Sequence, residues 1–171
     1  GSPYAALNFT DVDPALAEFD PSATPLEQFL ELVDAVHYHH GYLFMDIAIN
    51  HTGWAASIHE SHPDWLVRDE SGRIEVPGAW GVEWADLTRL DYSNTDLWQY
   101  MAGIFLRWCR RGVDGFRCDA GYMIPVEAWQ YIVAKVRQEY PDTLFFLEGL
   151  GGPLESTRQI LGCANFDWAY S

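Results

Sequence analysis

Apolar positions along the chain follow two periods, one typical of helices and one typical of buried strands. Residues 26–36 carry apolar side chains at helical spacing, directly after Thr24 and Pro25, which favour a helix start. The run 42–49 is almost continuously apolar, as in a fully buried parallel strand, and only Asp46 interrupts it. Because an unpaired buried carboxylate is costly, we expect Asp46 to have a partner.

After a long loop region, predicted helices and strands alternate again. Residues 52–93 are rich in Trp, His, Gly and Pro, and so long a loop in a compact domain usually is functional or has structure of its own. The remaining predicted elements are helices at 95–111, 125–140 and 154–161 and strands at 113–118, 143–147 and 165–168. This order predicts an α/β fold with a parallel sheet, either doubly wound or part of an eight-stranded barrel. No glycine-rich phosphate loop follows the first strand, which favours the barrel.

Composition describes a folded chain and limits its partners. The 171 residues are 49% hydrophobic and 20% charged, enough for one sizeable core. A net charge of −15 argues against a nucleic-acid or anionic-membrane partner, and no run of eighteen apolar residues occurs. The three cysteines have neither zinc-site nor disulfide spacing and are expected to be buried thiols. The compartment stays open.

Tryptophan is frequent in the loop region of residues 52–93. The flat apolar face of its ring, with a polar edge, suits a sugar ring as well as it suits packing. Both roles stay open for the four tryptophans of this region, Trp54, Trp65, Trp80 and Trp84.

Polar side chains follow three successive predicted strands. Asn50 and His51 follow the first, Asp119 the second and Glu148 the third. In a barrel, catalytic groups gather at this end of the strands. In an extended chain Arg117 and Asp119 point to the same side, and a neighbouring cation keeps a carboxylate ionised.

The two strand-end carboxyls can form a catalytic pair. Adjacent strands lie about 4.8 Å apart, so the carboxyls of Asp119 and Glu148 can approach the roughly 5 to 5.5 Å of retaining glycosidases. Asp119 would then attack the sugar, while Glu148, which follows an apolar run, would protonate the leaving oxygen. The alternative is a set of structural carboxylates and an ion pair at strand ends.

Three segments resemble the short motifs of the alpha-amylase family of glycoside hydrolases. Asp46-Ile-Ala-Ile-Asn50-His51 resembles the first motif, residues 112–120 resemble the second, and residues 146–149 resemble the third. The resemblance begins near Gly1-Ser2-Pro3-Tyr4 and covers almost the whole chain.

The resemblance implies roughly strands three to six of a (β/α)8 TIM barrel with flanking helices. Residues 1–171 would then be an incomplete catalytic barrel domain, with residues 52–93 as a small B-like insertion after the first strand present. Asp46 would be a structural anchor near Arg117.

The implied activity is that of a retaining glycoside hydrolase or transglycosylase. It would act on alpha-glucosidic linkages of starch or maltooligosaccharides through a covalent glycosyl-enzyme intermediate. By the resemblance, Asp119 is the nucleophile, Glu148 is the acid/base and Arg117 orients the nucleophile. His51 would hydrogen-bond the sugar, and Tyr4 would stack on it.

The sequence departs from the family pattern in two ways. The fourth motif, which carries a third catalytic carboxylate, has no counterpart before Ser171, so residues 1–171 alone are expected to be inactive without the rest of the barrel. The chemistry needs no cofactor, but Asn50 and Asp86 match calcium-binding positions of many members. Met123 stands where a histidine ligand is expected, and a thioether is a poor ligand for calcium, which counts against a structural ion.

Two other function classes remain open. One is a non-catalytic, amylase-like barrel that binds carbohydrate or serves as a scaffold, against which the joint presence of Asp119, Arg117 and Glu148 argues. The other is an unrelated barrel enzyme with Asp119 and Glu148 as metal ligands, which would lose activity on chelation.

Overall fold

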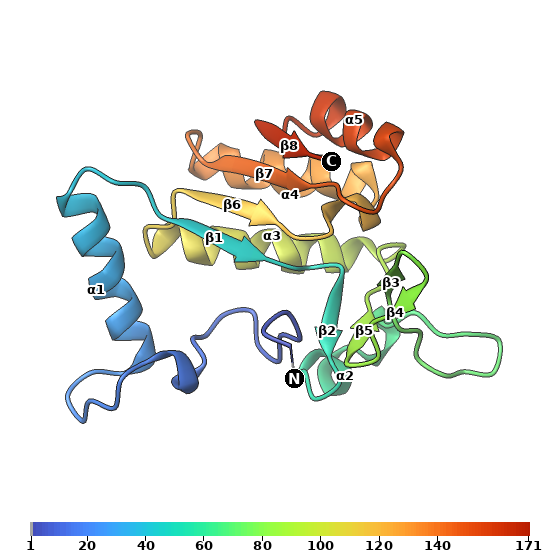
Figure 1. Cartoon of the computed structure of the whole chain (residues 1–171), viewed down its shortest axis with the longest axis horizontal. Helices are drawn as coiled ribbons and strands as arrows, with labels where there is room; N and C mark the ends of the chain where they lie inside the picture. Colours follow the sequence, from blue (N-terminus) through green and yellow to red (C-terminus); the bar gives the residue numbers. More distant parts are fainter. Residues whose placement is uncertain (1) are drawn as a thin grey trace.

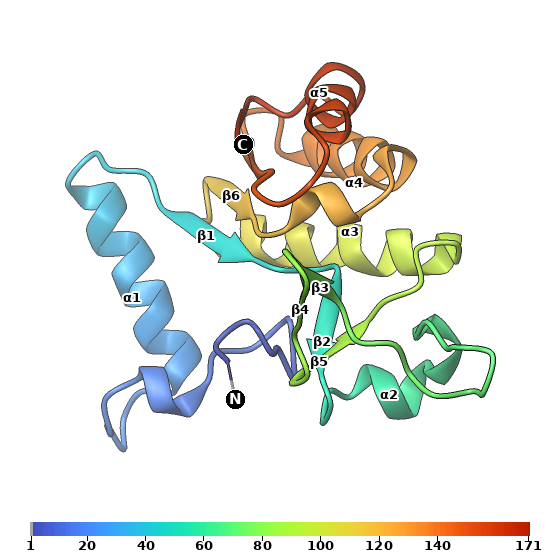
Figure 2. The same ribbon diagram turned by 45° about the vertical axis from the view of Figure 1, so that its right-hand side comes forward.

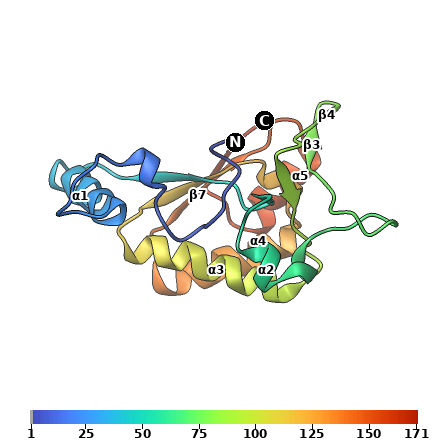
Figure 3. The ribbon, with the colours of Figure 1, turned by 90° about the horizontal axis from the view of Figure 1, so that it is seen from below.

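A four-stranded parallel sheet forms the centre of the molecule (Figure 1). The computed structural model describes residues 2–171, so Gly1 of the expected N-terminal segment lies outside it. The strands lie in the order β1-β6-β7-β8, with bounds Phe44–Ile47, Gly115–Cys118, Leu144–Glu148 and Trp168–Tyr170. Helices α3 (Thr95–Arg110) and α4 (Val126–Glu139) pack against each other on one side of this sheet (Figure 3). The predicted α/β alternation is therefore confirmed.

Strand register brings the polar strand ends to one edge of the sheet. Asp46 of β1 lies opposite Arg117 of β6, and Glu148 of β7 lies opposite Tyr170 of β8. The parallel pairing of β6 with β7 confirms that the strands leading to Asp119 and Glu148 are neighbours. Because parallel strands run in the same direction, side chains at their carboxyl ends gather at a single edge.

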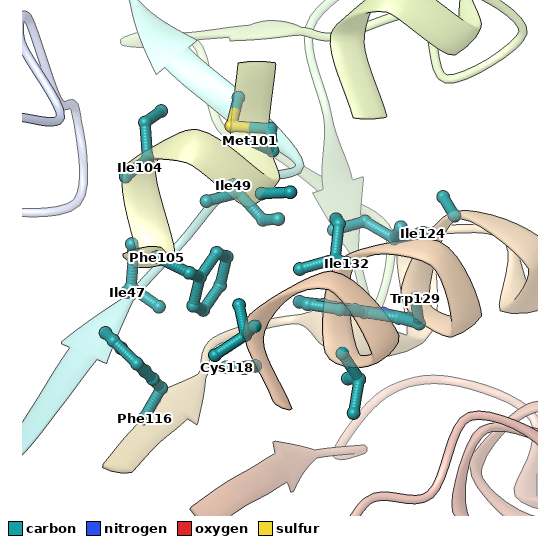
Figure 4. Packing of buried hydrophobic residues seen from close by; sticks show 14 of the residues in the cluster. Ile47, Ile49, Met101, Ile104, Phe105, Phe116, Cys118, Ile124, Trp129 and Ile132 are labelled. Carbon is teal, nitrogen blue, oxygen red and sulfur yellow. The ribbon is translucent and has the colours of Figure 1, made fainter. Parts of the chain in front are cut away.

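The core between the sheet and the helices is aromatic. Phe105 of α3 lies edge-on to Phe116 of β6, with ring centroids 4.7 Å apart, and 5.7 Å from the ring of Phe145 on β7. Its ring is 6.2 Å from that of Trp129 on α4. All four side chains are fully buried, and Figure 4 shows Phe105 between the strands and α4. These contacts fix the helices on the sheet and so hold the strand ends in place.

Helix α1 (Pro25–Tyr38) begins at the predicted capping box and packs beside the carboxyl end of α3. The rings of Phe29 and Trp108 are 5.3 Å apart in an edge-to-face arrangement. Gly112 ends α3 with a φ of 94°, as predicted, and any side chain there would run into Val33. This turn directs the chain into β6.

Residues 52–93 carry short elements of their own. Strand β2 pairs antiparallel with β5, and β3 pairs with β4 in a hairpin. Figure 2 shows both pairs next to the carboxyl end of β1. These elements and the remaining helices are β2 (His51–Gly53), α2 (Ile58–Ser61), β3 (Gly78–Ala79), β4 (Val82–Glu83), β5 (Leu87–Arg89), α5 (Leu154–Cys163) and the 3-10 turns Pro14–Leu16, Pro63–Trp65 and Gly121–Met123. Their description as a separate B-like domain stays a prediction.

The first strand differs from its prediction. Only Phe44–Ile47 of the run 42–49 is a strand, and it lies at an edge of the sheet formed by residues 2–171. Phe44 is therefore 46% exposed, and Asp46 is exposed instead of buried, although it is paired as expected. An apolar run indicates a strand but does not say whether both of its faces are covered.

Two predictions near the end of the chain are also wrong. The last strand begins at Trp168 and not at residue 165, because Asn165 adopts a left-handed φ of 57° in the turn after α5. Cys163 is exposed at the end of this helix, whereas Cys109 and Cys118 are the buried thiols that were expected.

Candidate active site

Arg117 is the centre of a side-chain cluster at the carboxyl ends of the strands. Its Nη1 donates to both carboxylate oxygens of Asp46, at 2.9 and 3.1 Å, and to Oδ1 of Asp119. Its Nε and Nη2 both donate to the hydroxyl of Tyr170. Partial burial lowers the pKa of Arg117, but the bonds to Asp46, Tyr170 and Asp119 outweigh this effect and raise the pKa above its ordinary value. The predicted pairing of Arg117 with Asp119 and with Asp46 is confirmed.

The backbone fixes Glu148 beside Asp119. Ala120, the residue after Asp119, has a left-handed conformation at φ 46°, which costs a non-glycine residue about 1–2 kcal/mol. In this conformation its N–H donates to Oε2 of Glu148 at 2.8 Å. Oε1 of Glu148 accepts the N–H of Leu150 at 2.6 Å, and the side chain is only 7% exposed. Strained backbone of this kind occurs where structure holds a site together.

The two carboxyls are held by different chemical groups. Asp119 is paired with the guanidinium of Arg117, which holds its carboxyl in a fixed orientation, as a nucleophile requires. Glu148 sits in a buried position, where both its oxygens meet peptide N–H groups. Different surroundings of two neighbouring carboxyls allow them to take different roles in acid–base chemistry.

Tyr4 and His51 lie next to this cluster. The hydroxyl of Tyr4 donates to Oδ2 of Asp46 at 2.9 Å, and this bond, together with burial, raises the pKa of Tyr4. His51 Nε2 lies 3.0 Å from the carbonyl oxygen of Tyr4. Burial lowers the pKa of His51, against the opposing effects of the Tyr4 carbonyl and of the charges on Asp119 and Asp86, so the neutral ring donates from Nε2. His51 is 1% exposed and lies beneath the Tyr4 backbone.

Two site residues were missed by the sequence reasoning. Tyr170 belongs to the Arg117 cluster, and no local pattern announces it, because its position depends on β8 pairing with β7. Tyr122 lies in the turn that follows Asp119. Partial burial raises the pKa of Tyr122, and the charges of Glu148 and Asp119 raise it further. Its place three residues after a strand-end carboxylate was the signal that could have identified it.

The expected calcium ligands do not form a site that fits this ion. Asn50 Nδ2 is 2.9 Å from the sulfur of Met123, and Asn50 Oδ1 is buried without a hydrogen-bond partner in residues 2–171. Asp86 is exposed and accepts the backbone N–H of Ser2 at 3.1 Å. Within this described part of the chain, no three His, Cys, Asp or Glu side chains could hold a metal ion. Calcium requires about six to eight oxygen ligands, so an amide oxygen beside a thioether does not fit it.

Comparison of the sequence with known proteins finds relatives that align with the whole chain. No protein-family model matches the chain. It is similar to alpha-1,4-glucan:maltose-1-phosphate maltosyltransferases of Cereibacter sphaeroides, 27% identical over 174 residues, and of Pseudomonas aeruginosa, 27% identical over 175 residues. All of this chain aligns in both cases, to 25% and 26% of the relatives' lengths. The chain therefore spans about a quarter of the curated relatives it matches.

Two of the solved structures with a similar fold are alpha-amylases. An alpha-amylase from Lactobacillus plantarum superimposes with a TM-score of 0.81 and 28% identity, over 100% of this chain and 40% of that one. A maltogenic alpha-amylase from Thermotoga neapolitana gives a TM-score of 0.74 and 28% identity, over 99% of this chain and 36% of that one. The four-stranded sheet and its helices thus correspond to part of the alpha-amylase (β/α)8 barrel, as predicted. The strand order, the sequence relatives and the structural neighbours together support membership of the chain in the alpha-amylase family of glycoside hydrolases.

Proposed function

We propose that the protein carrying this chain cleaves alpha-glucosidic linkages with retention of configuration, by hydrolysis or by glycosyl transfer. The observation that carries the proposal is the hydrogen bond from the Ala120 N–H to Glu148 Oε2. It holds a buried carboxyl next to Asp119, which is paired with Arg117. Two carboxyls at the ends of neighbouring strands, one to attack the sugar and one to exchange a proton, are the groups that a retaining glycosidase uses.

The proposed reaction has two steps. Asp119 attacks the anomeric carbon, the bond to the leaving oxygen breaks, and Glu148 gives its proton to that oxygen. Glu148, now a carboxylate, then takes a proton from water or from a sugar hydroxyl, whose oxygen attacks the anomeric carbon and releases Asp119. Arg117 keeps Asp119 oriented throughout.

We propose that the substrate is a neutral alpha-glucan. The sequence relatives are named as alpha-1,4-glucan:maltose-1-phosphate maltosyltransferases, and two structural neighbours are named as alpha-amylases. A net charge of −15 repels a phosphorylated sugar more than a neutral one, which favours the glucan as donor. The same charge disfavours nucleic acid and anionic membranes as partners, and none of the helices in residues 2–171 has the length and apolarity needed to cross a bilayer.

Tyr4 and His51 are proposed to bind the sugar at the cleavage point. Tyr4 is 38% exposed and its hydroxyl is held by Asp46, which supports a role of its ring in stacking on the sugar. Nδ1 of His51 is buried without a partner in the described residues, and because Nε2 carries the proton bound by the Tyr4 carbonyl, Nδ1 is the ring nitrogen that can accept a hydrogen bond from a sugar hydroxyl.

The test is Asp119→Asn in the complete protein, with maltoheptaose and alpha-maltose 1-phosphate as alternative donors. We expect the variant to lose at least about a thousandfold in kcat while its circular dichroism is unchanged, because an amide cannot replace the nucleophile. Asp142→Asn, at an exposed loop residue, is the matched control. NMR of the first wild-type product should show the alpha anomer. Unchanged turnover in Asp119→Asn, or a beta product, would contradict the proposal, and inactivation by chelation alone would favour a metal-dependent enzyme.

A further inference from the structure

Trp80 is the one tryptophan of the insertion whose position packing does not explain. Trp65 is buried and stacks on His62, and Trp84 lies edge-on to His51. The indole of Trp54 donates to the backbone of Ala85. Trp80 instead is 73% exposed.

The backbone at Trp80 is unfavourable for this residue type. Trp80 and the following Gly81 form the two-residue turn between β3 and β4, with φ values of 52° and 75°. Turns with two positive φ values strongly prefer Asn, Asp or Gly, and a bulky residue there is a genuine outlier. An exposed aromatic ring held at a backbone cost suggests a function.

The ring of Trp80 lies against the loop that leaves the proposed acid/base. A Cβ placed on Gly151 would come within 2.9 Å of the Trp80 ring and 3.1 Å of the Tyr122 hydroxyl. A Cβ on Gly152 would collide with the Tyr122 ring. These two glycines therefore let both aromatic side chains approach the loop, which begins at Glu148.

The position of this loop indicates which sugar the two rings would meet. Glu148 protonates the leaving oxygen in the proposed reaction, so the loop after Glu148 borders the leaving-group side of the cleaved linkage. Tyr122 lies in the turn directly after Asp119, and Trp80 reaches the same place from the β3–β4 hairpin. A sugar ring can stack on an exposed aromatic face there.

We infer that Trp80 and Tyr122 form the wall of a subsite that binds the glucosyl unit on the leaving-group side, and the acceptor sugar during transfer. This inference rests on the proposed function. Trp80 reaches this subsite only because the β3–β4 hairpin of the insertion lies over the loop after β7. The insertion therefore determines which acceptor sugars are used. Trp80 is thus a specificity-determining residue and has no part in the bond-breaking step.

The test compares two substrates in the complete protein with Trp80→Ala. Maltoheptaose places a sugar in the subsite, whereas alpha-maltosyl fluoride releases fluoride, which has no ring to stack on Trp80. We expect kcat/KM for maltoheptaose to fall about tenfold, the loss expected for one stacked aromatic contact, and that for the maltosyl fluoride to stay unchanged. Trp80→Tyr should recover most of the loss, and Trp54→Ala is the matched control within the insertion.

A second readout does not depend on turnover. In an Asp119→Asn background, binding of maltotriose should quench tryptophan fluorescence, and Trp80→Phe should remove most of this quenching. An equal loss of kcat/KM for both substrates in Trp80→Ala would overturn the inference. Trp80 would then have only a structural role, and the proposed function would be unaffected. Full activity of Asp119→Asn on both substrates would instead overturn the proposed function.

Discussion

The hydroxyl of Tyr170 accepts two hydrogen bonds from Arg117, at 3.0 Å from Nε and 2.6 Å from Nη2. Nη1 of the same guanidinium is bound to Asp46 and Asp119. Tyr170 therefore holds the side of the guanidinium that faces away from the proposed nucleophile. Because the guanidinium is planar and rigid, fixing one side orients the other.

Removing this hydroxyl should lower the rate without weakening substrate binding. Hydrogen bonds to charged groups contribute about 1.5–3 kcal/mol, so we expect Tyr170→Phe to lower kcat by roughly 10- to 100-fold. KM should change little, because Tyr170 orients Arg117 and Asp119. Steady-state kinetics on maltoheptaose measure both values, with Tyr42→Phe, at an exposed tyrosine, as the control. An unchanged kcat would show that Asp46 alone is enough to position Arg117.

Stability should fall as the pH drops through the range where free histidine becomes protonated. Burial lowers the pKa of His51 and also of His59, so the unfolded chain takes up protons below about pH 6.5 before the folded chain does. The free energy of unfolding therefore rises with pH in this window, by at most about 1.4 kcal/mol per pH unit for each histidine. Urea unfolding between pH 5 and 8, an interval of roughly the usual histidine range, measures this slope.

The contribution of His51 can be isolated by substitution. His51→Asn should reduce the slope, whereas His39→Asn, at the exposed end of α1, should leave it unchanged. The comparison uses slopes, so a general loss of stability in the variant does not affect it. A slope in His51→Asn equal to that of the wild type would contradict the expectation.

Core packing at Phe105 should be essential for stability. Its ring is fully buried and meets Phe116, Phe145 and Trp129. Phe105→Ala leaves a cavity and should lower the free energy of unfolding by about 3–5 kcal/mol. Leu144→Ala, at an exposed strand residue, is the control and should cost far less. Urea denaturation of the two variants provides the comparison, and similar losses would argue against the packing described.

Calcium should not contribute to stability. Asn50 faces the thioether of Met123, and this pair is a poor ligand set for a hard cation. Since a ligand raises the melting temperature only by binding the folded state, neither EDTA nor added calcium chloride should shift Tm. Differential scanning calorimetry in both conditions is the measurement. A rise in Tm with calcium would mean that oxygen ligands other than Asn50 and Asp86 form a site.

Residues 1–171 alone should be inactive. The described sheet has β1 and β8 at its edges, with exposed apolar side chains such as Phe44 and Trp168, and a complete barrel needs about 250 residues. The third catalytic carboxylate that the family resemblance implies has no counterpart in the chain. Reducing-sugar release from maltoheptaose by the purified 171-residue chain measures this directly, and turnover comparable to that of the complete protein would refute it.

The sequence by itself determined the main helices and strands outside residues 52–93 and the two candidate carboxyls. Hydrophobic periodicity located the strands and helices, because each element must present an apolar face to the core. Strand-end position identified Asp119 and Glu148, and the extended chain between Arg117 and Asp119 predicted their pairing, since residues two apart in a strand share a face.

Only the tertiary structure decided which distant groups complete the site. Tyr170 reaches Arg117 through the pairing of β7 with β8, and Trp80 reaches the loop after Glu148 because the β3–β4 hairpin lies over it. The exposure of Asp46 likewise depends on its strand lying at an edge of the described sheet. A local sequence pattern predicts only the helix or strand to which a residue belongs. The contacts of Tyr170 and Trp80 join segments far apart in the chain, so they form only when the strands have taken their order in the sheet.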